Sequence, residues 1–346
     1  MKNLFEIIIF VSGLMVSTLF AQDIHFTQMR YSPLNLNPAL AGAEQNLQAV
    51  VNYRDQWRSV ATPYQTIGAS VDGRFKEKRG GNGVLAWGVN FFNDRAGDAR
   101  MTTTNANLNL GYHLFLNRNS SLGLAIQGGF GQRGIDPAGG TWSSQFANGE
   151  FNTALPSGEN FDQMNFSHFD AGAGIVYHYK EKEGYMRGND QFTLTAGLSA
   201  FHVNQPSSSF LVGGQDDLAI RFSGFVYADF GVSKSNFSIA PAIYYNRQGP
   251  HQEILAGSYL RVLLKEGSKR TGFIKQLATS YGIFYRFGDA FAAKFMIEYS
   301  NYALGFAYDF NVSSLTTVSN SRGGVEFFLR FVLPNPFGHS SKARIN

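Results

Sequence analysis

Cysteine is absent from this 346-residue chain. Its absence excludes a disulfide framework, a thiolate metal site and a lipid anchor on an N-terminal cysteine. Charged side chains are also scarce, because they make up 16% of the residues and leave a net charge of +4. The basic residues do not gather into one patch, so the sequence gives no indication that the protein binds nucleic acid.

Long apolar runs are equally scarce. The one candidate extends from Ile7 to Phe20, after Lys2 and before the small residue Ala21. These features are typical of a secretory signal peptide, so we expect residues 1–21 to be removed and the mature chain to begin at Gln22. The alternative, a membrane-anchoring helix, is disfavoured because the run is short. A mature chain that lies in a membrane would have to cross it as strands, since backbone polar groups in lipid must pair within the protein.

What the sequence does contain is alternation of apolar and polar residues. In residues 105–117, Asn105, Asn107 and Asn109 alternate with apolar side chains. Successive side chains of a strand point to opposite faces, so one face is apolar and the other polar. The pattern recurs along the chain in segments long enough to cross a bilayer, which predicts a transmembrane β-barrel. The apolar positions of this first example are Ala106, Leu108, Leu110, Tyr112, Leu114 and Leu116.

Matching to a period of two residues predicts an all-β, antiparallel barrel of roughly fourteen strands. An even number of strands fits closure of a bacterial outer-membrane barrel. We expect a single domain over residues 22–346, with an N-terminal insert at 22–46, a barrel at 47–332 and a tail at 333–346. The predicted strands span residues 47–57, 66–75, 83–94, 105–117, 121–133, 166–179, 191–203, 219–231, 236–247, 252–264, 277–287, 291–299, 302–310 and 323–332.

The connections between these strands fall into two classes. If the barrel begins and ends on the periplasmic side, the long connections rich in Gly, Ser and Asn all face outside, and the tight turns face the periplasm. Basic residues of the longer periplasmic turns are candidates for docking a partner, although solvated turns would look the same. The long connections are 95–104, 134–165, 204–218 and 311–322. The candidate docking residues are Lys76, Lys78, Arg79, Lys180, Lys182, Lys265, Lys269 and Arg270.

The alternation places many charged side chains on the interior face. Facing lipid near the midplane, an Arg or Lys would cost about 2–4 kcal/mol. Both signs occur in similar number, so we predict a network of paired charges that fills the lumen, rather than a pore lined by one sign. The members of this network are Arg54, Asp72, Arg74, Arg221, Asp229, Glu253, Arg261, Arg286, Lys294, Glu298, Asp309, Glu326 and Arg330.

The segment before the first strand does not alternate. Pro33 and Pro38, with Asn35 and Asn37, prevent regular strand pairing there. The segment is too apolar for a free tail, so we expect it to insert into the lumen, with Asn35, Asn37 and Pro38 as its motif. A short periplasmic tail is the alternative.

Motifs for catalysis or cofactor binding are weak. Gly129–Gly134 matches the dinucleotide fingerprint by its letters, but residues 135–140 contain Pro and two Gly and cannot begin the helix that this fingerprint requires. The seven histidines form no HExxH motif, and no GxSxG motif occurs. We therefore expect no catalytic, metal or cofactor-binding residues and no enzymatic activity.

Seven segments near the two ends of the expected mature chain stand out as motifs: Gln22–Gln28, Ser32–Gly42, Asn52–Trp57, Pro63–Thr66, Ser70–Asp72, Gly305–Asn311 and Gly323–Leu329. In this order and spacing they resemble the PorP/SprF family of outer-membrane proteins. The resemblance implies a multi-pass protein of the outer membrane that belongs to the type IX secretion and gliding apparatus of Bacteroidetes-like bacteria. It also implies three kinds of partner: outer-membrane lipids, a secreted surface adhesin, and a periplasmic lipoprotein or peptidoglycan-linked secretion component.

An outer-membrane channel for small apolar molecules is the alternative function. Barrels of the fatty-acid-transporter type also carry an N-terminal hatch with an Asn-Pro-Ala-like element, which residues 37–39 resemble. Such a channel requires a continuous apolar passage through the lumen. The predicted lumen contains paired charges instead, and this favours the secretion or anchoring role.

Overall fold

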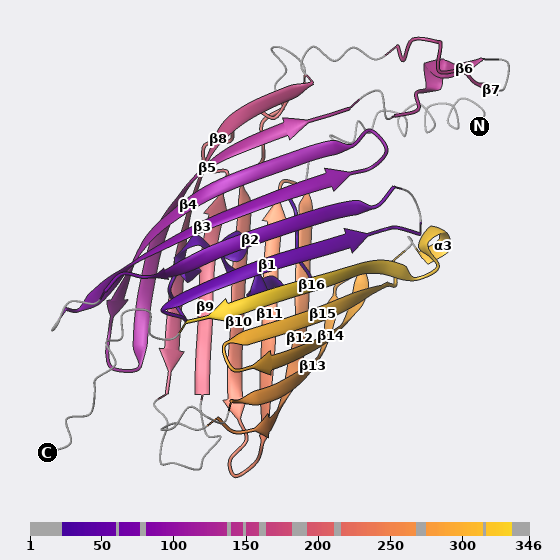
Figure 1. The fold of residues 1–346 in the computed structure, drawn as a ribbon. Coiled ribbons are helices and arrows are strands. Elements are labelled where there is room, and N and C mark those ends of the chain that lie inside the picture. Colours follow the sequence, from indigo (N-terminus) through magenta and orange to yellow (C-terminus); the bar gives the residue numbers. More distant parts are fainter. Residues whose placement is uncertain are drawn as a thin grey trace, which may run out of the picture.

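The structure is a closed β-barrel in which each strand is antiparallel to both of its neighbours (Figure 1). It is a computed structural model that describes residues 23–59, 62–76, 81–136, 140–147, 150–158, 164–181, 192–210, 216–267, 275–313 and 316–333. The expected signal peptide and tail residues 334–346 lie outside these ranges. The barrel closes where β1 pairs with β16, and Arg54 lies opposite Glu326 across this seam.

All fourteen predicted strands are confirmed, with ends that differ by a few residues. The largest difference is in β4, which begins at Met101 because Thr103 and Thr104 continue the pairing with β3 although the sequence there does not alternate. The strands of the barrel are β1 (Leu47–Gln56), β2 (Tyr64–Arg74), β3 (Gly83–Ala96), β4 (Met101–Phe115), β5 (Ser120–Gly134), β8 (Asn165–Lys180), β9 (Phe192–Phe201), β10 (Arg221–Gly231), β11 (Phe237–Gln248), β12 (His251–Lys265), β13 (Leu277–Arg286), β14 (Ala290–Tyr299), β15 (Tyr302–Asn311) and β16 (Arg322–Val332).

The two faces of the wall differ as the alternation predicts. In β4, Asn109 is fully buried, whereas Leu108 and Leu110 are about half exposed. Large apolar side chains are exposed along the other strands as well, for example Ile126 in β5 and Ile283 in β13. This outward face is the one that a membrane barrel presents to lipid, and the opposite face lines the lumen. Among the described residues, no helix is both long and apolar enough to cross a bilayer.

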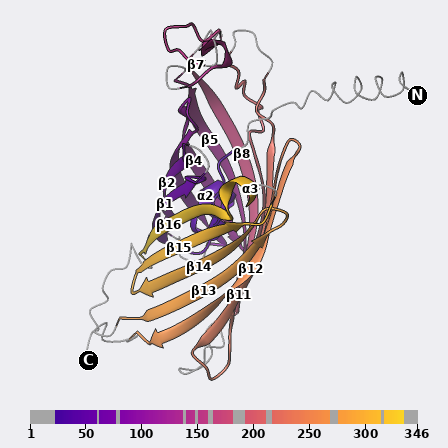
Figure 2. The same cartoon turned by 90° about the vertical axis from the view of Figure 1, so that its right-hand side faces the viewer.

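The N-terminal residues 23–46, which we call the lumen segment, lie inside the ring of strands (Figure 2). They form η1 (Met29–Tyr31), α2 (Pro33–Leu36) and η2 (Pro38–Leu40). Pro33 and Pro38 each stand at the start of a helix, where the missing backbone N–H has no intrahelical acceptor to lose. The prolines that exclude a strand therefore begin short helices.

The two ends of the barrel are unequal. The described parts of connections 135–164, 202–220 and 312–321 lie at one end, which we call the long-loop end. They contain η4 (Ser143–Gln145), the small hairpin of β6 (Phe146–Ala147) and β7 (Glu150–Phe151), and α3 (Thr316–Ser319) (Figure 1). The first residue of β1 and the last residue of β16 lie at the opposite end, which we call the short-turn end.

Candidate functional site in the barrel lumen

The lumen segment is bonded to the wall at both ends of the barrel. At the long-loop end, the carboxylate of Asp23 accepts a hydrogen bond from His202 Nε2 at 2.6 Å. At the short-turn end, the backbone N–H of Gly42 donates to Asp72 Oδ2 at 2.9 Å. Between these points, Leu34 is completely buried. The segment therefore passes from one end of the lumen to the other before it enters β1.

Thr27 lies at the centre of a buried group of charges. Its hydroxyl donates to Asp309 at 2.8 Å and accepts from Arg54 at 2.8 Å and from Arg286 at 2.7 Å. Both guanidinium groups also pair with Asp309 at 3.1 Å, and Arg54 pairs with Glu326 at 3.2 Å. These side chains come from β1, β13, β15 and β16, so one threonine of the lumen segment joins four strands of the wall.

Backbone groups of the same segment complete this centre. Glu326 accepts the backbone N–H groups of Thr27 and Gln28 at 2.6 and 2.9 Å, and Lys294 Nζ donates to the carbonyl oxygen of Thr27 at 2.6 Å. Burying charges is costly unless every group is paired and hydrogen-bonded. Without the lumen segment, Glu326 and Lys294 would lose these partners. The charged wall and its insert therefore depend on each other.

The remaining predicted lumen charges have partners at other points along the lumen. Asp229 pairs with Arg30 of the lumen segment at 2.7 Å. Near the short-turn end, Arg74 donates to the carbonyl oxygens of Gly42 and Ala43. Arg286 of the charged centre also pairs with Glu253 at 2.9 Å. Further ion pairs of the predicted charges include Arg221–Asp23 at 3.3 Å, Arg261–Glu298 at 2.5 Å and Arg330–Glu298 at 3.7 Å.

The three motif residues of the insert have different roles. Asn37 is fully buried, and its amide donates to the carbonyl oxygens of Ile175 and Leu198, each at 3.0 Å. Its side-chain oxygen accepts the N–H of Ala39 at 2.8 Å, which caps η2. Asn35 accepts from Asn90 of β3 at 2.9 Å. Pro38, the third motif residue, is buried as the first residue of η2.

The aromatic side chains that lie in the lumen were not identified from the sequence. Tyr31 of the lumen segment stacks on Phe328 with ring centroids 3.9 Å apart, and Arg30 lies over the ring of Tyr227 at 4.5 Å. Phe328 shares strand parity with Glu326, and Tyr227 with Asp229. The parity that assigned those charges to the lumen was therefore a signal for the aromatics too. The other buried aromatic side chains of this core are Phe225, Tyr244, Tyr259 and Phe284.

Three of the eight candidate docking residues lie in the described part of the chain. Lys76, Lys180 and Lys265 are exposed and lie next to or at the ends of β2, β8 and β12, at the short-turn end. The structure leaves them apart from the charged centre of the lumen. The others, Lys78, Arg79, Lys182, Lys269 and Arg270, lie outside the described residues.

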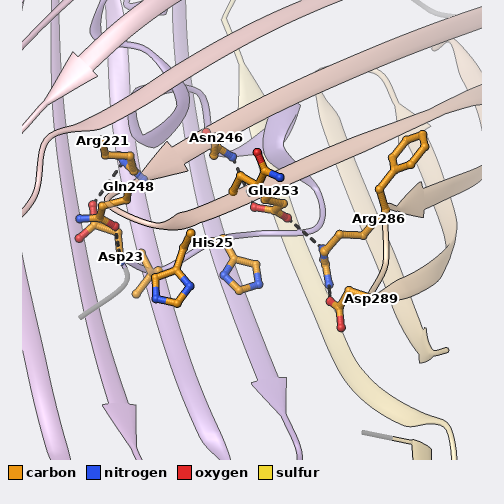
Figure 3. Close-up of a pocket in the computed structure, with 12 residues that line it drawn as sticks. Asp23, His25, Arg221, Asn246, Gln248, Glu253, Arg286 and Asp289 are labelled. Carbon is orange, nitrogen blue, oxygen red and sulfur yellow. Dashed lines mark hydrogen bonds and ion pairs between the residues drawn. The ribbon is translucent and has the colours of Figure 1, made fainter. Parts of the chain in front are cut away.

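A cavity of about 220 Å³ lies at the long-loop end (Figure 3). Asp23 and His25 of the lumen segment line one part of it, and Arg221, Gln248 and Glu253 of the wall line another. Within the described ranges, no group of three or more His, Asp or Glu side chains is arranged to hold a metal ion. The cavity is therefore a polar recess next to the beginning of the lumen segment.

A family model described as type IX secretion system membrane protein PorP/SprF matches residues 18–331. The chain belongs to this family. It is thus a membrane component of the type IX secretion system, and its lipid-facing closed antiparallel barrel places it in the outer membrane, which it spans with its strands. Membership of the PorP/SprF family agrees with the resemblance seen in the sequence.

Among curated proteins, no sequence matches the chain. Similar solved structures include the TodX ΔS2S3 mutant monoaromatic hydrocarbon channel, with 10% identity and a TM-score of 0.47 over 87% of this chain and 94% of that one. The CymD monoaromatic hydrocarbon channel has 12% identity and a TM-score of 0.41 over 93% and 97%. CdiB from Acinetobacter baumannii has 8% identity and a TM-score of 0.38 over 84% and 60%. Such low identities say nothing about what this chain binds.

Proposed function

We propose that the protein is a rigid outer-membrane mount that holds a secreted adhesin at the cell surface and contacts a periplasmic lipoprotein or peptidoglycan-linked component. Membership of a type IX secretion family supports a role in this system. We assign the long-loop end to the outside, because barrels of this kind have long extracellular loops and short periplasmic turns. A mount needs no catalytic group, and we propose that the protein is not an enzyme.

The filled lumen is the observation that carries this proposal. The lumen segment crosses the barrel interior and is bonded to the wall at Asp23, Thr27 and Gly42. Bonds that join many strands through one insert favour a stiff body that keeps its shape under load. A stiff body suits attachment better than passage.

A channel for small apolar molecules remains the second candidate. It would require a continuous apolar path, and the buried aromatic side chains around Tyr31 and Phe328 offer apolar surface for part of one. The buried ion pairs of Arg54 with Asp309 and Glu326 lie in the same lumen, where an apolar solute would have to displace them. This arrangement favours the mount.

The two ends offer surfaces for different partners. Phe146 and Phe151 of the β6–β7 hairpin are 57% and 40% exposed at the long-loop end. Exposed aromatic side chains are enriched in protein interfaces, so we propose that this hairpin contacts the adhesin. Lys76, Lys180 and Lys265 are exposed at the other end, where they would attract an acidic surface of the periplasmic partner.

Deletion of the gene tests the proposed function. We expect antibody labelling of intact cells to show loss of the adhesin from the surface, and we expect gliding to stop. The wild-type gene should restore both. Normal display of the adhesin in the deletion strain, together with failed uptake of a small apolar compound, would contradict the mount and favour the channel.

A further inference from the structure

The beginning of the lumen segment occupies a site formed by the connection after β9 and by the long-loop ends of β10 and β11. Asp23 Oδ2 lies 2.6 Å from His202 Nε2 and 3.3 Å from Arg221 Nε (Figure 3 shows the Arg221 side). The backbone N–H of Asp23 donates to Gln248 Oε1 at 2.9 Å. Two side chains that can carry positive charge and one amide acceptor thus surround one carboxylate and the peptide N–H beside it.

Contacts other than those with Asp23 hold His202 and Arg221 in place. His202 Nδ1 is bonded to Asp170 Oδ1 at 2.9 Å, and His202 is held in a left-handed backbone conformation with φ 57°. The guanidinium of Arg221 lies over the ring of Phe201 at 4.2 Å. The site would therefore keep its shape if Asp23 left it, which is the property that lowers the cost of binding another carboxylate.

Asp23 satisfies this site only in part. The Nε atom of Arg221 is buried and close enough to Asp23 for an ion pair, yet it has no hydrogen-bond partner. A buried N–H without an acceptor costs free energy that a better placed carboxylate would recover. An external ligand can thus gain a hydrogen bond that Asp23 does not make.

Apart from the three contacts of Asp23 described above, little holds the first residues of the lumen segment in this site. Asp23, Ile24 and His25 are only partly buried, whereas Phe26 is 3% exposed and Thr27 is anchored in the charged centre. Displacement could therefore release three residues and stop at Phe26. The cavity beside Asp23 has room for the incoming chain, and His251 and Gln252 at its rim are exposed.

We propose that the long-loop end contains a carboxylate-binding site for an acidic peptide segment of the partner that is held at the cell surface. A carboxylate of that segment replaces Asp23 between His202 and Arg221, and the adjoining peptide occupies the cavity. The identity of the partner rests on the proposed function, but the site and its occupation by Asp23 do not. Asp23 then acts as an internal competitor that keeps the site closed until a partner arrives.

Binding of a short peptide to the purified full-length barrel tests this proposal. The probe is a fluorescently labelled, N-acetylated Asp-Ile-His-Phe peptide, which copies residues 23–26 and carries its label at the carboxyl end. We expect the Asp23→Asn variant to bind the probe about tenfold or more tightly than the wild-type barrel, because the competing carboxylate is gone. Adding Arg221→Gln to that variant should abolish the gain. A probe with Asn in place of Asp should not bind to any of the three proteins.

Heat-modifiable migration in gels confirms that each variant is a folded barrel. Equal binding of the probe to the Asp23→Asn variant and to the double variant would overturn the proposal, as would failure of the probe to bind either folded variant. These measurements use neither adhesin nor cells. Their outcome is therefore separate from the deletion experiment that tests the proposed function.

Discussion

At the scale of single residues, close approach between insert and wall decides which side chains the wall can carry. Asn37 lies directly over Gly174 of β8 and Gly197 of β9. A β-carbon on residue 174 would fall 2.0 Å from Asn37 Oδ1 and 3.1 Å from Pro38 Cδ. The absence of a side chain at this point of the wall therefore allows the motif of the lumen segment to bond to the carbonyl oxygens around it.

Gly174→Ala should displace Asn37 and Pro38 from their contact with the wall. We expect a loss of about 1–3 kcal/mol in stability, which is typical when an extra carbon is forced into a packed site. The measurement is the temperature at which the purified barrel loses its heat-modifiable migration. Gly128→Ala is the matched control, because a β-carbon there meets no atom within 4 Å. Equal midpoints for the two variants would contradict the predicted clash.

His202 should make the contact at the long-loop end sensitive to pH. Burial lowers its pKa, but the carboxylates of Asp23 and Asp170 outweigh that effect and raise the pKa from 6.5 to about 9, even though Arg221 and His168 also lie nearby. A raised pKa in the folded state stabilises the protein fully below pH 6.5 and loses this contribution as the pH rises through about 9.

We therefore expect protease cleavage near residue 23 to accelerate between pH 6.5 and 9. The new side chain of the His202→Gln variant carries no charge at any of these pH values. After correction for protease activity, the cleavage rate of this variant should therefore change less with pH than that of the wild type. Parallel pH profiles for the two proteins would rule out His202 as the titrating group.

At the scale of elements, hydrogen bonds join the end of the lumen segment to the first hairpin, close to the start of β1. Asp72 of β2 accepts the N–H of Gly42 and, at 3.3 Å, the side chain of Gln48. Gly42 has φ 60°, and a β-carbon on it would lie 2.9 Å from Gly73 O, so glycine fits this turn best. The chain leaves the lumen here and enters the wall.

Asp72→Ala should loosen this junction, because the buried N–H of Gly42 would lose its acceptor. A buried donor left without a partner costs about 1–3 kcal/mol. Asp72→Asn keeps an acceptor oxygen and should retain most of the stability. Heat-modifiable migration of the two variants provides the measurement, and migration of Asp72→Ala at the wild-type temperature would exclude this role for the junction.

The positions of the strands could be predicted from the sequence, whereas the packing inside the barrel could not, for a physical reason. Alternation in residues 105–117 reports the two environments of one strand, so strand positions follow from the local sequence. The contacts of Thr27 with β13, β15 and β16 join residues 259 to 299 positions apart in the sequence, so the local sequence contains no signal for them. Lumen aromatics such as Phe328 and Tyr227 resemble lipid-facing residues until parity with a neighbouring charge is considered.

At the scale of the whole molecule, the lumen segment closes a barrel that would otherwise contain water. Deleting residues 23–37 removes the part of the segment that fills the charged centre, and it should produce ion conductance in planar bilayers, where the wild type should conduct little. Asn37→Ala keeps the segment but removes its bonds to Ile175 and Leu198, and we expect brief openings from it. A deletion barrel that folds but does not conduct would show that other residues seal the lumen.

We expect the exposed lysines of the short-turn end to affect binding of the periplasmic partner and not binding of the adhesin. Reversing Lys76, Lys180 and Lys265 to Glu should reduce co-purification of periplasmic components from native membranes severalfold and leave the barrel folded. The matched control reverses three exposed arginines at the opposite end, Arg95, Arg100 and Arg322, with the same change in net charge. Equal effects of the two triple variants would indicate a response to net charge rather than docking.

The passage of residues 23–46 through the barrel constrains how the protein can assemble. The described chain starts beside His202 and finishes at Leu333, next to the first residue of β1, so its two extremities face opposite compartments. A segment that the wall surrounds along most of its length cannot easily be threaded into a finished barrel. We therefore infer that the N-terminal residues are gathered by the nascent sheet before β1 and β16 join, which makes that seam the last part of the barrel to form.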